Sequence, residues 1–334
     1  MSIVIPCRNE AGFISRCLAS LESAELDRAC TTVFVCDGMS NDGTREEVEA
    51  YTRRLPWMVM VDNPQRTTPQ ALNLGLRQRP FDVGVIIGAH TEVEPDFVAR
   101  NLAALAADRT AGCTGGVIIS EYNDARSRHI GAAMAHPFGV GSAHFRTGLR
   151  SGYVDTVAFG AYRSQVFDAV GWFNEALVRN QDDEFNYRVT KAGFKIVLDP
   201  SIRSRYHVRA SYTKLFRQYR QYGYWKVYVN RLHGALTTLR QLVPAVWVAC
   251  LGSGAVVTMF LPSLWWAYLA GVLLYLCTAT WSALRTGVGL QGIAGVTWAF
   301  VVLHLAYGLG YWQGIYRFLL LRAQPSSQST LSSR

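Results

Sequence analysis

The C-terminal third of the chain is almost free of charge, and this limits its folds more than any other feature. Residues 242–321 contain no Asp, Glu or Lys, and Arg285 and Arg317 are their only formal charges. The region holds three apolar runs, at residues 243–261, 264–284 and about 293–311. Each run is close to the ~20 residues that a helix needs to cross a bilayer. We therefore expect about three transmembrane helices within residues 242–321.

The overall composition also fits a membrane-attached protein. Charged residues make up 17% of the chain and hydrophobic residues 50%, with a formal charge of +9 at pH 7. Because cationic side chains favour the cytoplasmic face of membranes, we assign this charge to a membrane-facing surface and expect membrane lipids as partners. Nucleic acid is the alternative partner. The sequence shows no Lys/Arg-rich helix and no aromatic platform for single strands, so we expect no nucleic-acid binding.

The N-terminus and the cysteines indicate a cytoplasmic location for the first part of the chain. The opening residues read as a strand, not as a basic segment followed by an apolar one, so no secretory signal is predicted. The seven cysteines form no CxxC pair and no close Cys/His pair. This pattern favours small buried thiols in a reducing compartment over disulfides or a zinc site. We expect an integral protein of the inner (plasma) membrane.

Residues 1–90 alternate between short apolar runs and helical patterns. The apolar runs predict strands, and apolar residues at helical spacing after each run predict helices. The expected strands are residues 2–6, 32–36, 57–61 and 83–87, and the expected helices are residues 13–21, 45–54 and 69–79. This repetition predicts an α/β fold with a mostly parallel central sheet, in which ligands bind beyond the carboxyl ends of the strands.

Polar residues gather at these predicted strand ends. Asn9 and Glu10 follow the first strand, Asp37 follows the second, and His90 follows the fourth. We expect these residues to line a crevice at one edge of the sheet. No GxGxxG fingerprint follows the first strand, and the chain has no GxxxxGK[ST] phosphate loop. Asp37 can simply cap the next helix. Alternatively, its carboxylate can accept hydrogen bonds from the N–H groups of a base or from a ribose hydroxyl.

A further acidic cluster lies at residues 179–188. Phe185 and Val189 recur at helical spacing, which places Asp182 and Asp183 at the start of a helix. The helix dipole and the unpaired N–H groups favour carboxylates there, so these side chains can serve only as caps. A catalytic role is the alternative, because acidic and Gly-rich segments lie upstream at the predicted strand ends.

Several segments together resemble glycosyltransferase family two. Residues 3–10 are similar to its opening VIPxxNE motif, and residues 36–44 to its DDGSxDGT loop with Gly38 in place of the second Asp. Residues 181–184 resemble its ED motif with Gln181 in place of Glu. The other similar segments are residues 63–75, 160–163 and 171–175. The set runs in order over about residues 2–226. It looks closest to the glucosyltransferases of succinoglycan-type exopolysaccharide assembly, which act on lipid-linked acceptors.

The resemblance implies a GT-A fold over residues 1–210, with a nucleotide-sugar site and a divalent metal. The donor-site residues that it implies are Pro6, Asn9, Glu10, Asp37, Asn73, Gly88 and Ala89. The family's Asp-x-Asp metal motif stands here as Gly88-Ala89-His90, so His90 is the expected metal ligand. Imidazole suits Mn²⁺ better than Mg²⁺. The alternative is that His90 is an ordinary loop residue, because the first carboxylate of the motif is missing.

The resemblance assigns catalysis to the acidic helix. Asp182 aligns with the family's catalytic base, and Asp183 is the alternative base because the register rests on one motif. A carboxylate near a dry helix start, beside other acids, can gain the raised pKa that a general base needs. The implied reaction is inverting transfer of a sugar from a UDP-sugar, with UDP-glucose favoured, to a polyprenyl-diphosphate-linked saccharide.

The acceptor side is expected in two segments. The resemblance places Gly160 and Ala161 before the acceptor-side acid. Residues 211–241 read as basic, aromatic interfacial helices, with cations facing phosphates and aromatic rings at headgroup depth. The residues assigned to the lipid phosphate are Arg217, Gln218, Gln221, Tyr224 and Trp225. A plain amphipathic helix docked on the protein is the alternative. The QxxRW motif of processive family members lacks its Arg here.

The sequence is also compatible with two other functions. Transfer to polyprenyl phosphate needs no strong base, because that acceptor ionises on its own. A sugar-nucleotide-binding pseudoenzyme that assists other glycan-assembly enzymes is motivated by Gly88 and Gln181.

The topology follows from the same segments. We expect a cytoplasmic catalytic domain and a third apolar run that crosses the membrane. This places the C-terminus outside, with residues 322–334 as a disordered tail.

Overall fold

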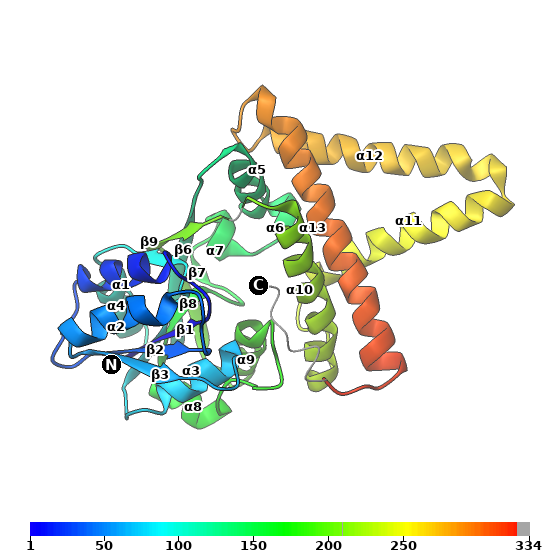
Figure 1. The fold of residues 1–334 in the computed structure, drawn as a ribbon. Helices are drawn as coiled ribbons and strands as arrows, with labels where there is room; N and C mark the ends of the chain where they lie inside the picture. The colour runs from blue at the N-terminus through cyan, green and yellow to red at the C-terminus, as the bar shows by residue number, and fades with distance from the viewer. Residues whose placement is uncertain (209, 326–334) are drawn as a thin grey trace. The chain divides into compact units, whose positions relative to one another are not determined.

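The computed structural model describes residues 1–208 and 210–325. The chain divides into two compact units. The sheet unit consists of Met1–Ser120 and His144–His207, and the helical unit consists of Glu121–Ala143 and Val208–Arg334. Most of the tail predicted to be disordered lies outside the described residues. Figure 1 labels the elements of both units.

The four strands predicted from apolar runs form the parallel half of the sheet. They are β1 (Ser2–Cys7), β2 (Thr32–Asp37), β3 (Met58–Asp62) and β4 (Val83–Ile86). Their order is β3-β2-β1-β4, and each neighbouring pair is parallel. The polar loops after β1, β2 and β4 therefore leave the same edge of the sheet, as the sequence predicts.

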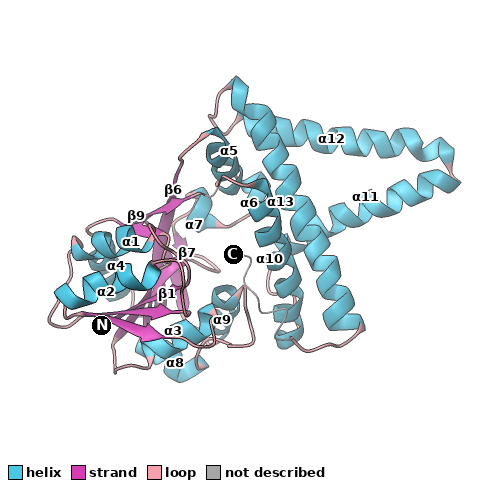
Figure 2. Ribbon diagram, in the orientation of Figure 1, coloured by secondary structure: helices cyan, strands magenta, loops and turns pink. Residues whose placement is uncertain are grey.

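The other half of the sheet is antiparallel. Its strands are β5 (Thr91–Val93), β6 (Ala111–Glu121), β7 (Gly152–Tyr153), β8 (Ala158–Arg163) and β9 (Lys195–His207). Strand β8 lies antiparallel between β4 and β6, and β9 pairs antiparallel with β5 and β7. The predicted α/β fold is confirmed, but the sheet is mixed rather than mostly parallel, because β5 to β9 pair antiparallel (Figure 2).

Helices cover both faces of the sheet because side chains along each strand alternate between the faces. The helices of the sheet unit are α1 (Ile14–Glu22), α2 (Thr44–Arg54), α3 (Thr68–Leu76), α4 (Phe97–Ala107), α7 (His144–Thr147), α8 (Ser164–Val170) and α9 (Gln181–Lys191). Ile3 and Ile5 join one apolar cluster with α1, α2 and α4. Val4 joins the opposite cluster with α3, α8 and α9.

The helical unit contains the three apolar runs. Its helices are α5 (Ala125–Met134), α6 (Pro137–Val140), α10 (Tyr212–His233), α11 (Leu242–Phe260), α12 (Trp265–Leu284) and α13 (Ile293–Gly314). Short turns of 3₁₀ helix lie at Leu239–Gln241, Pro262–Leu264 and Leu290–Gly292, and a π-helical turn lies at Ile315–Leu320. Three segments of the described chain are long and apolar enough to cross a membrane, which confirms the expected number of candidates.

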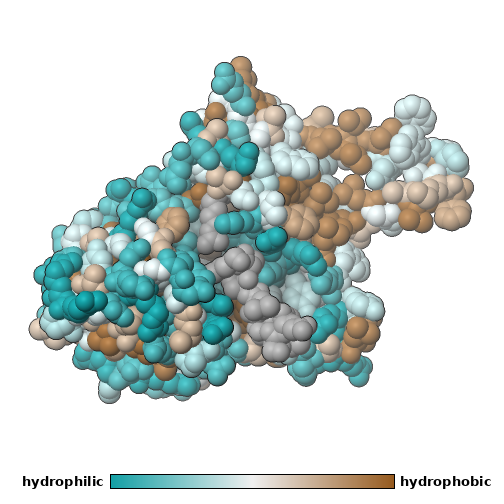
Figure 3. Space-filling model, viewed as in Figure 1, coloured by the Kyte–Doolittle hydropathy of each residue, from teal (hydrophilic) through white to brown (hydrophobic). Residues whose placement is uncertain are grey.

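The three apolar segments differ in how far protein covers them. The most apolar windows are 11% buried in Leu239–Phe260 and 17% buried in Pro262–Leu284, but 50% buried in Leu290–Leu320. Helices α11 and α12 form a hairpin that projects from α13 (Figure 1) and carries a largely apolar surface (Figure 3). The hairpin is thus mostly uncovered by protein and needs an apolar surrounding, whereas half of the most apolar window of the third segment is buried.

Helices α5 and α6 belong to the helical unit, which the sequence did not predict. Residues 1–210 were expected to form one domain, yet Glu121–Ala143 groups with the C-terminal helices. The Phe138 ring packs edge-on against Phe300 with 5.0 Å between centroids. His304 Nε2 lies 2.8 Å from the Phe138 carbonyl oxygen, and Tyr275 Oη lies 2.9 Å from His304 Nδ1. Buried polar contacts thus tie α6 to α12 and α13.

Helices α10 and α13 touch through glycines. A Cβ added at Gly223 would lie 2.1 Å from the Tyr307 carbonyl oxygen, and one at Gly310 would lie 2.0 Å from the Arg220 carbonyl oxygen. Only hydrogen fits at either position, so the two backbones are in direct contact, as at glycine-lined helix interfaces in membranes. Helix α10 is therefore docked along α13.

This docking corrects the prediction for two residues of α10. Tyr224 and Trp225 were expected to present their rings to the lipid headgroups, but only 8% and 1% of their surfaces are exposed. Both pack against Phe318, with ring centroids 4.7 and 6.0 Å apart. Arg217 is exposed, as expected, and Gln218 donates to Tyr222 Oη at 2.9 Å. Gln221 is half-buried on the same helix.

The glycine contact gives a prediction for stability. Gly310→Ala should destabilise the helical unit by about 1–3 kcal/mol, because the backbone oxygen of Arg220 cannot move away as a side chain could. Gly271→Ala in α12 is the matched control, because no atom lies within 4 Å of its added Cβ. Thermal unfolding of both variants in detergent measures the difference. A Gly310→Ala midpoint equal to that of Gly271→Ala would contradict the close contact.

Candidate active site at the carboxyl ends of the parallel strands

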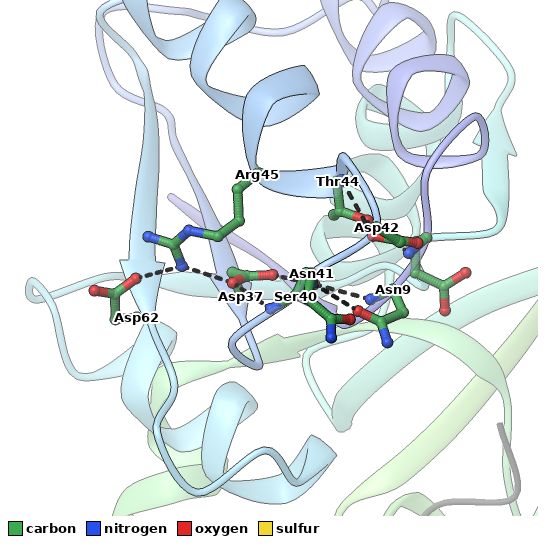
Figure 4. A network of polar contacts seen from close by, with 9 residues as sticks. Asn9, Asp37, Ser40, Asn41, Asp42, Thr44, Arg45 and Asp62 are labelled. Atoms are coloured by element: carbon green, nitrogen blue, oxygen red, sulfur yellow. Dashed lines mark hydrogen bonds and ion pairs between the residues drawn. The ribbon is translucent and has the colours of Figure 1, made fainter.

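A buried carboxylate organises the loop after β2. Asp37 is fully buried, and its Oδ2 accepts hydrogen bonds from Arg45 Nη1 at 2.7 Å and from the Ser40 amide at 3.0 Å. Ser40 Oγ donates to Asp37 Oδ1 at 2.5 Å. Arg45 also reaches Asp62 at the end of β3, with 2.8 Å between Nη1 and Oδ1 (Figure 4). The Asp37 carboxylate, which was predicted to contact a base or ribose, therefore lies buried beneath the loop. There its hydrogen bonds fix the conformation of the loop.

The loops after β1 and β2 are joined by further hydrogen bonds. The Asn9 amide donates to Ser40 Oγ at 2.8 Å, and Asn9 Oδ1 accepts from the Asn41 amide at 3.1 Å (Figure 4). Asn9 has a φ of 52°, a left-handed conformation that Asn adopts more readily than most residues. The Glu10 amide donates to Thr44 Oγ1 at 2.8 Å. Two of the predicted polar loops thus form one rigid surface.

The loop after β4 meets the loop after β1. His90 Nε2 lies 2.6 Å from Glu10 Oε2, and the two side chains are 14% and 1% exposed. The His90 ring packs edge-on against Phe13, with 4.6 Å between centroids. The structure therefore brings together an imidazole and a carboxylate from separate strand ends.

The sequence reasoning missed a second histidine beside this pair. His207, at the end of β9, has its Nε2 2.6 Å from Glu92 Oε1 on the neighbouring strand β5. Its ring centroid lies 6.0 Å from that of Phe13, which also contacts His90. Only the pairing of β5 with β9 places His207 there, and that pairing joins segments more than a hundred residues apart. No local pattern in the sequence indicates it.

The residues around His90 are better suited to a cation that is also bound by a substrate than to a metal ion bound by protein side chains alone. Within residues 1–208 and 210–325, no group of three His, Cys, Asp or Glu side chains could hold a metal ion. His90 Nε2 and the Glu10 carboxylate supply two donors, which suits a divalent ion that takes its other ligands from a diphosphate and water. Imidazole and carboxylate are both suitable ligands for Mn²⁺.

Packing explains the glycine at the first position of the metal motif. A Cβ at Gly88 would lie 3.0 Å from Phe159 Cε1 and 3.3 Å from Thr91 Oγ1. Phe159 itself has a φ of 52°, an uncommon conformation for an aromatic residue. The phenyl ring thus occupies the space that an acidic side chain at position 88 would need. Ala89, the next residue of the loop, is buried.

The acidic helix α9 is fixed by aromatic packing. Phe185 stacks on Phe173 with 4.2 Å between ring centroids, and Arg188 Nη2 donates to the Trp172 carbonyl oxygen at 2.9 Å. Burial raises the pKa of Tyr162, and the negative charge of Asp182 adds to this effect. Tyr162 is thus a neutral donor, and its Oη donates to Asn186 Oδ1 at 2.9 Å. These contacts hold the start of α9 in place.

The two candidate bases differ in exposure. Asp182 is exposed and Asp183 is half-buried, and the Asp183 amide donates to Asp182 Oδ1 at 2.9 Å. Glu184 is buried and forms an ion pair of 2.8 Å with Arg188. The expected dry helix start is therefore not found at Asp182.

Four predicted site residues are buried or half-buried within the sheet unit. Asn73 was expected at the donor site, but it is buried and its Nδ2 donates to the Phe173 carbonyl oxygen at 2.9 Å and to Glu175 Oε1 at 2.8 Å. Its Oδ1 accepts from the Phe173 amide at 3.0 Å, so the side chain ties α3 to the segment after α8. Gly160 and Ala161, expected near the acceptor, are buried within β8. Pro6 is half-buried in β1.

The chain is similar to known proteins along most of its length. The family model for glycosyl transferase family 2 matches residues 2–171. The succinoglycan biosynthesis protein ExoA of Rhizobium meliloti (strain 1021) is 30% identical over 324 residues, which are 95% of each chain. A dolichyl N-acetyl-alpha-D-glucosaminyl phosphate 3-beta-D-2,3-diacetamido-2,3-dideoxy-beta-D-glucuronosyltransferase of Methanococcus voltae is 26% identical over 231 residues, 67% of this chain and 71% of that one.

The fold has a counterpart among solved structures. Mannosyltransferase PcManGT from Pyrobaculum calidifontis, solved in complex with GDP-Man and Mn²⁺, superposes with a TM-score of 0.59 at 19% identity. The match covers 92% of this chain and 86% of that one. At this level of identity the likeness concerns the fold.

The two partners of Arg45 give a matched pair of variants. Asp37→Ala should destabilise the protein by about 1–3 kcal/mol and weaken nucleotide binding, because it leaves Arg45 and Ser40 without a buried acceptor. Asp62→Ala removes a carboxylate that is 60% exposed and should cost less than about 1 kcal/mol. Thermal unfolding and calorimetric titration with UDP measure both effects. Equal losses in the two variants would refute the anchoring role of Asp37.

Proposed function

This chain belongs to glycosyl transferase family 2, and on that basis we propose that it is an inverting, membrane-attached hexosyltransferase. Its fold is GT-A-like, with a mixed sheet. The proposed donor is a UDP-sugar, with UDP-glucose favoured, and the proposed acceptor is a polyprenyl-diphosphate-linked saccharide. The observation that carries the proposal is the edge where Asn9, Glu10 and His90 meet beside the Asp37 loop.

The donor side of the proposal rests on this edge. The surface formed by Asn9, Ser40 and Asn41 offers backbone and side-chain polar groups next to a fixed carboxylate, which suits a base and a ribose. His90 and Glu10 would hold a divalent cation, with Mn²⁺ favoured over Mg²⁺, which would neutralise the diphosphate leaving group. The mannosyltransferase of similar fold binds a sugar nucleotide together with Mn²⁺, which supports this assignment.

The acceptor side rests on α9. We assign to Asp182 the removal of the proton from the acceptor hydroxyl as that oxygen attacks the anomeric carbon. A single displacement of this kind inverts the anomeric configuration. Because Asp182 is exposed at a helix start held by Phe185 and Arg188, a large lipid-linked saccharide can approach it without rearrangement of the helix.

The biological setting follows from relatives and from the helical unit. The ExoA relative takes part in succinoglycan biosynthesis, which supports a role in exopolysaccharide or cell-surface glycan assembly beside other enzymes of that assembly. The apolar helices support attachment to the inner (plasma) membrane. The sheet unit would then work in the cytoplasm, where nucleotide sugars are available.

Transfer to polyprenyl phosphate is a second candidate, favoured by one observation. Asp182 is exposed rather than desolvated, and a phosphate acceptor that is already ionised needs no strong base. The two functions differ in their dependence on Asp182. A pseudoenzyme would bind the nucleotide and transfer nothing to either acceptor.

Substitution of the acidic pair tests the catalytic assignment. Asp182→Asn should lower kcat about 10²–10⁴-fold while UDP binding changes only a few-fold, because a general base contributes mainly to rate. Asp183→Asn is the matched control on the same helical turn and should retain most activity. Turnover with a lipid-linked saccharide and calorimetric binding of UDP measure the two effects. The reverse pattern would assign the base to Asp183. If neither variant loses activity when polyprenyl phosphate is supplied as the acceptor, the phosphate acceptor is favoured.

Metal dependence tests the role of the His90–Glu10 pair. We expect chelator to abolish transfer, Mn²⁺ to restore it better than Mg²⁺, and His90→Ala to raise the Mn²⁺ concentration needed for half-maximal activity about tenfold or more. His233→Ala, in the helical unit, is the control and should behave like the wild type. Activity that survives excess chelator would remove the metal from the mechanism.

A further inference from the structure

Helix α10 accompanies α13 along its whole length. Near the start of both helices, Tyr212 Oη donates to the Gly295 carbonyl oxygen at 3.1 Å. Near their ends, Arg231 Nη1 donates to the Phe318 carbonyl oxygen at 3.0 Å. Between these points the backbones touch at Gly223 and Gly310. The two helices therefore run in the same direction, side by side, and must occupy the same depth in or near a membrane.

The exposed face of α10 is unsuited to hydrocarbon. Lys214, Arg217 and Arg220 are exposed along it, and Arg220 Nη2 donates to Gln313 Oε1 of α13 at 2.8 Å. If α13 crossed the bilayer, these cations would be carried into its core, where charged side chains are strongly disfavoured. The polar face of α10 therefore argues against a transmembrane position for α13.

The exposed side of α13 carries an apolar and aromatic stripe, with Gln313 at the border toward α10. Trp298, Leu309, Trp312 and Tyr316 are exposed, and Val301 and Leu305 lie between them at helical spacing. The neighbouring positions are covered by α5, α6, α10, α11 and α12. A helix with one apolar stripe, beside a polar helix rich in Lys and Arg, has the pattern of an element that lies in the membrane–water interface.

The lengths of the three apolar segments agree with this distinction. The segments Leu239–Phe260 and Pro262–Leu284 are about 33 and 35 Å long at 1.5 Å per residue, close to the ~30 Å of a bilayer core. The segment Leu290–Leu320 is about 46 Å long by the same measure, well beyond that thickness. A helix that lies in the interface has no such limit on its length.

We propose that the α10–α13 pair lies in the headgroup region of the membrane and that only the α11–α12 hairpin crosses it. The turn at Pro262–Leu264, with Trp265 and Trp266 after it, then reaches the far headgroups. Arg285, Arg317 and Arg322 stay on the side of the sheet unit, which agrees with the positive-inside tendency. The C-terminus also stays on that side, contrary to the external terminus expected from the sequence. In this arrangement the exposed apolar stripe of α13 contacts the phospholipid interface.

Cysteine labelling in intact cells tests the sidedness. Cys250 and Cys277 are exposed on the hairpin and are replaced by Ala, while exposed Cys30 of the sheet unit is kept as an internal control. With an impermeant maleimide, Ser263→Cys should be labelled in intact cells. Gln324→Cys and Cys30 should be labelled only after permeabilisation. Labelling of Gln324→Cys in intact cells with Cys30 silent, or silence of Ser263→Cys in intact cells, overturns the proposal.

Depth measurements test the position of α13 itself. Bimane attached to single cysteines at positions 298, 309 and 316 should be quenched to the same extent by a nitroxide placed near the lipid headgroup. Positions 243 and 250 on α11 serve as controls and should differ strongly in quenching, because position 243 lies near one end of the spanning segment and position 250 near its middle. The maximum depth at position 309 would show a spanning helix. Absence of quenching at all three positions would show that protein, such as a second copy of this chain, covers the stripe. Either result overturns the proposal.

Discussion

The arrangement of the crevice depends on one buried carboxylate. Asp37 is fully buried, and a carboxylate without partners in that position would be prohibitively costly. Arg45 and Ser40 satisfy it, and in doing so they fix the loop after β2. Ser40 then accepts from the Asn9 amide, which orders the loop after β1 and the Glu10 side chain that meets His90. The proposed donor surface, with the Glu10–His90 pair, is therefore preorganised by hydrogen bonds that start at Asp37.

A different constraint governs the helical unit, where glycines set how closely helices approach. The contacts at Gly223 and Gly310 bring α10 against α13. This contact docks α10 along α13 and buries Tyr224 and Trp225 between them and Phe318. The same contact ties α13 to a cationic neighbour. The hairpin of α11 and α12 is not covered by protein to the same extent as α13, so it is the part of the unit that requires lipid around it.

The sequence predicts well what depends on neighbours along the chain. The four parallel strands are apolar runs, the loops after them carry the polar residues, and the three apolar segments are visible from charge alone. Prediction from the sequence fails where contacts between segments far apart in the chain determine the surroundings of a residue. Asn73 reads as part of a donor-site motif, but its side chain is taken by Phe173, a hundred residues away. His207 reaches the site only through the pairing of β9 with β5, and the exposure of Asp182 depends on tertiary packing.

We propose that this site transfers a sugar from a nucleotide to a lipid-linked acceptor. Incubation of the purified full-length protein with several UDP-sugars and a lipid extract, with the products identified by mass spectrometry, tests this proposal. We expect release of UDP and the gain of one hexose by a polyprenyl-diphosphate-linked saccharide, with the anomeric configuration inverted relative to the donor. Nucleotide binding without any glycosylated lipid product across the donors and acceptors would contradict it.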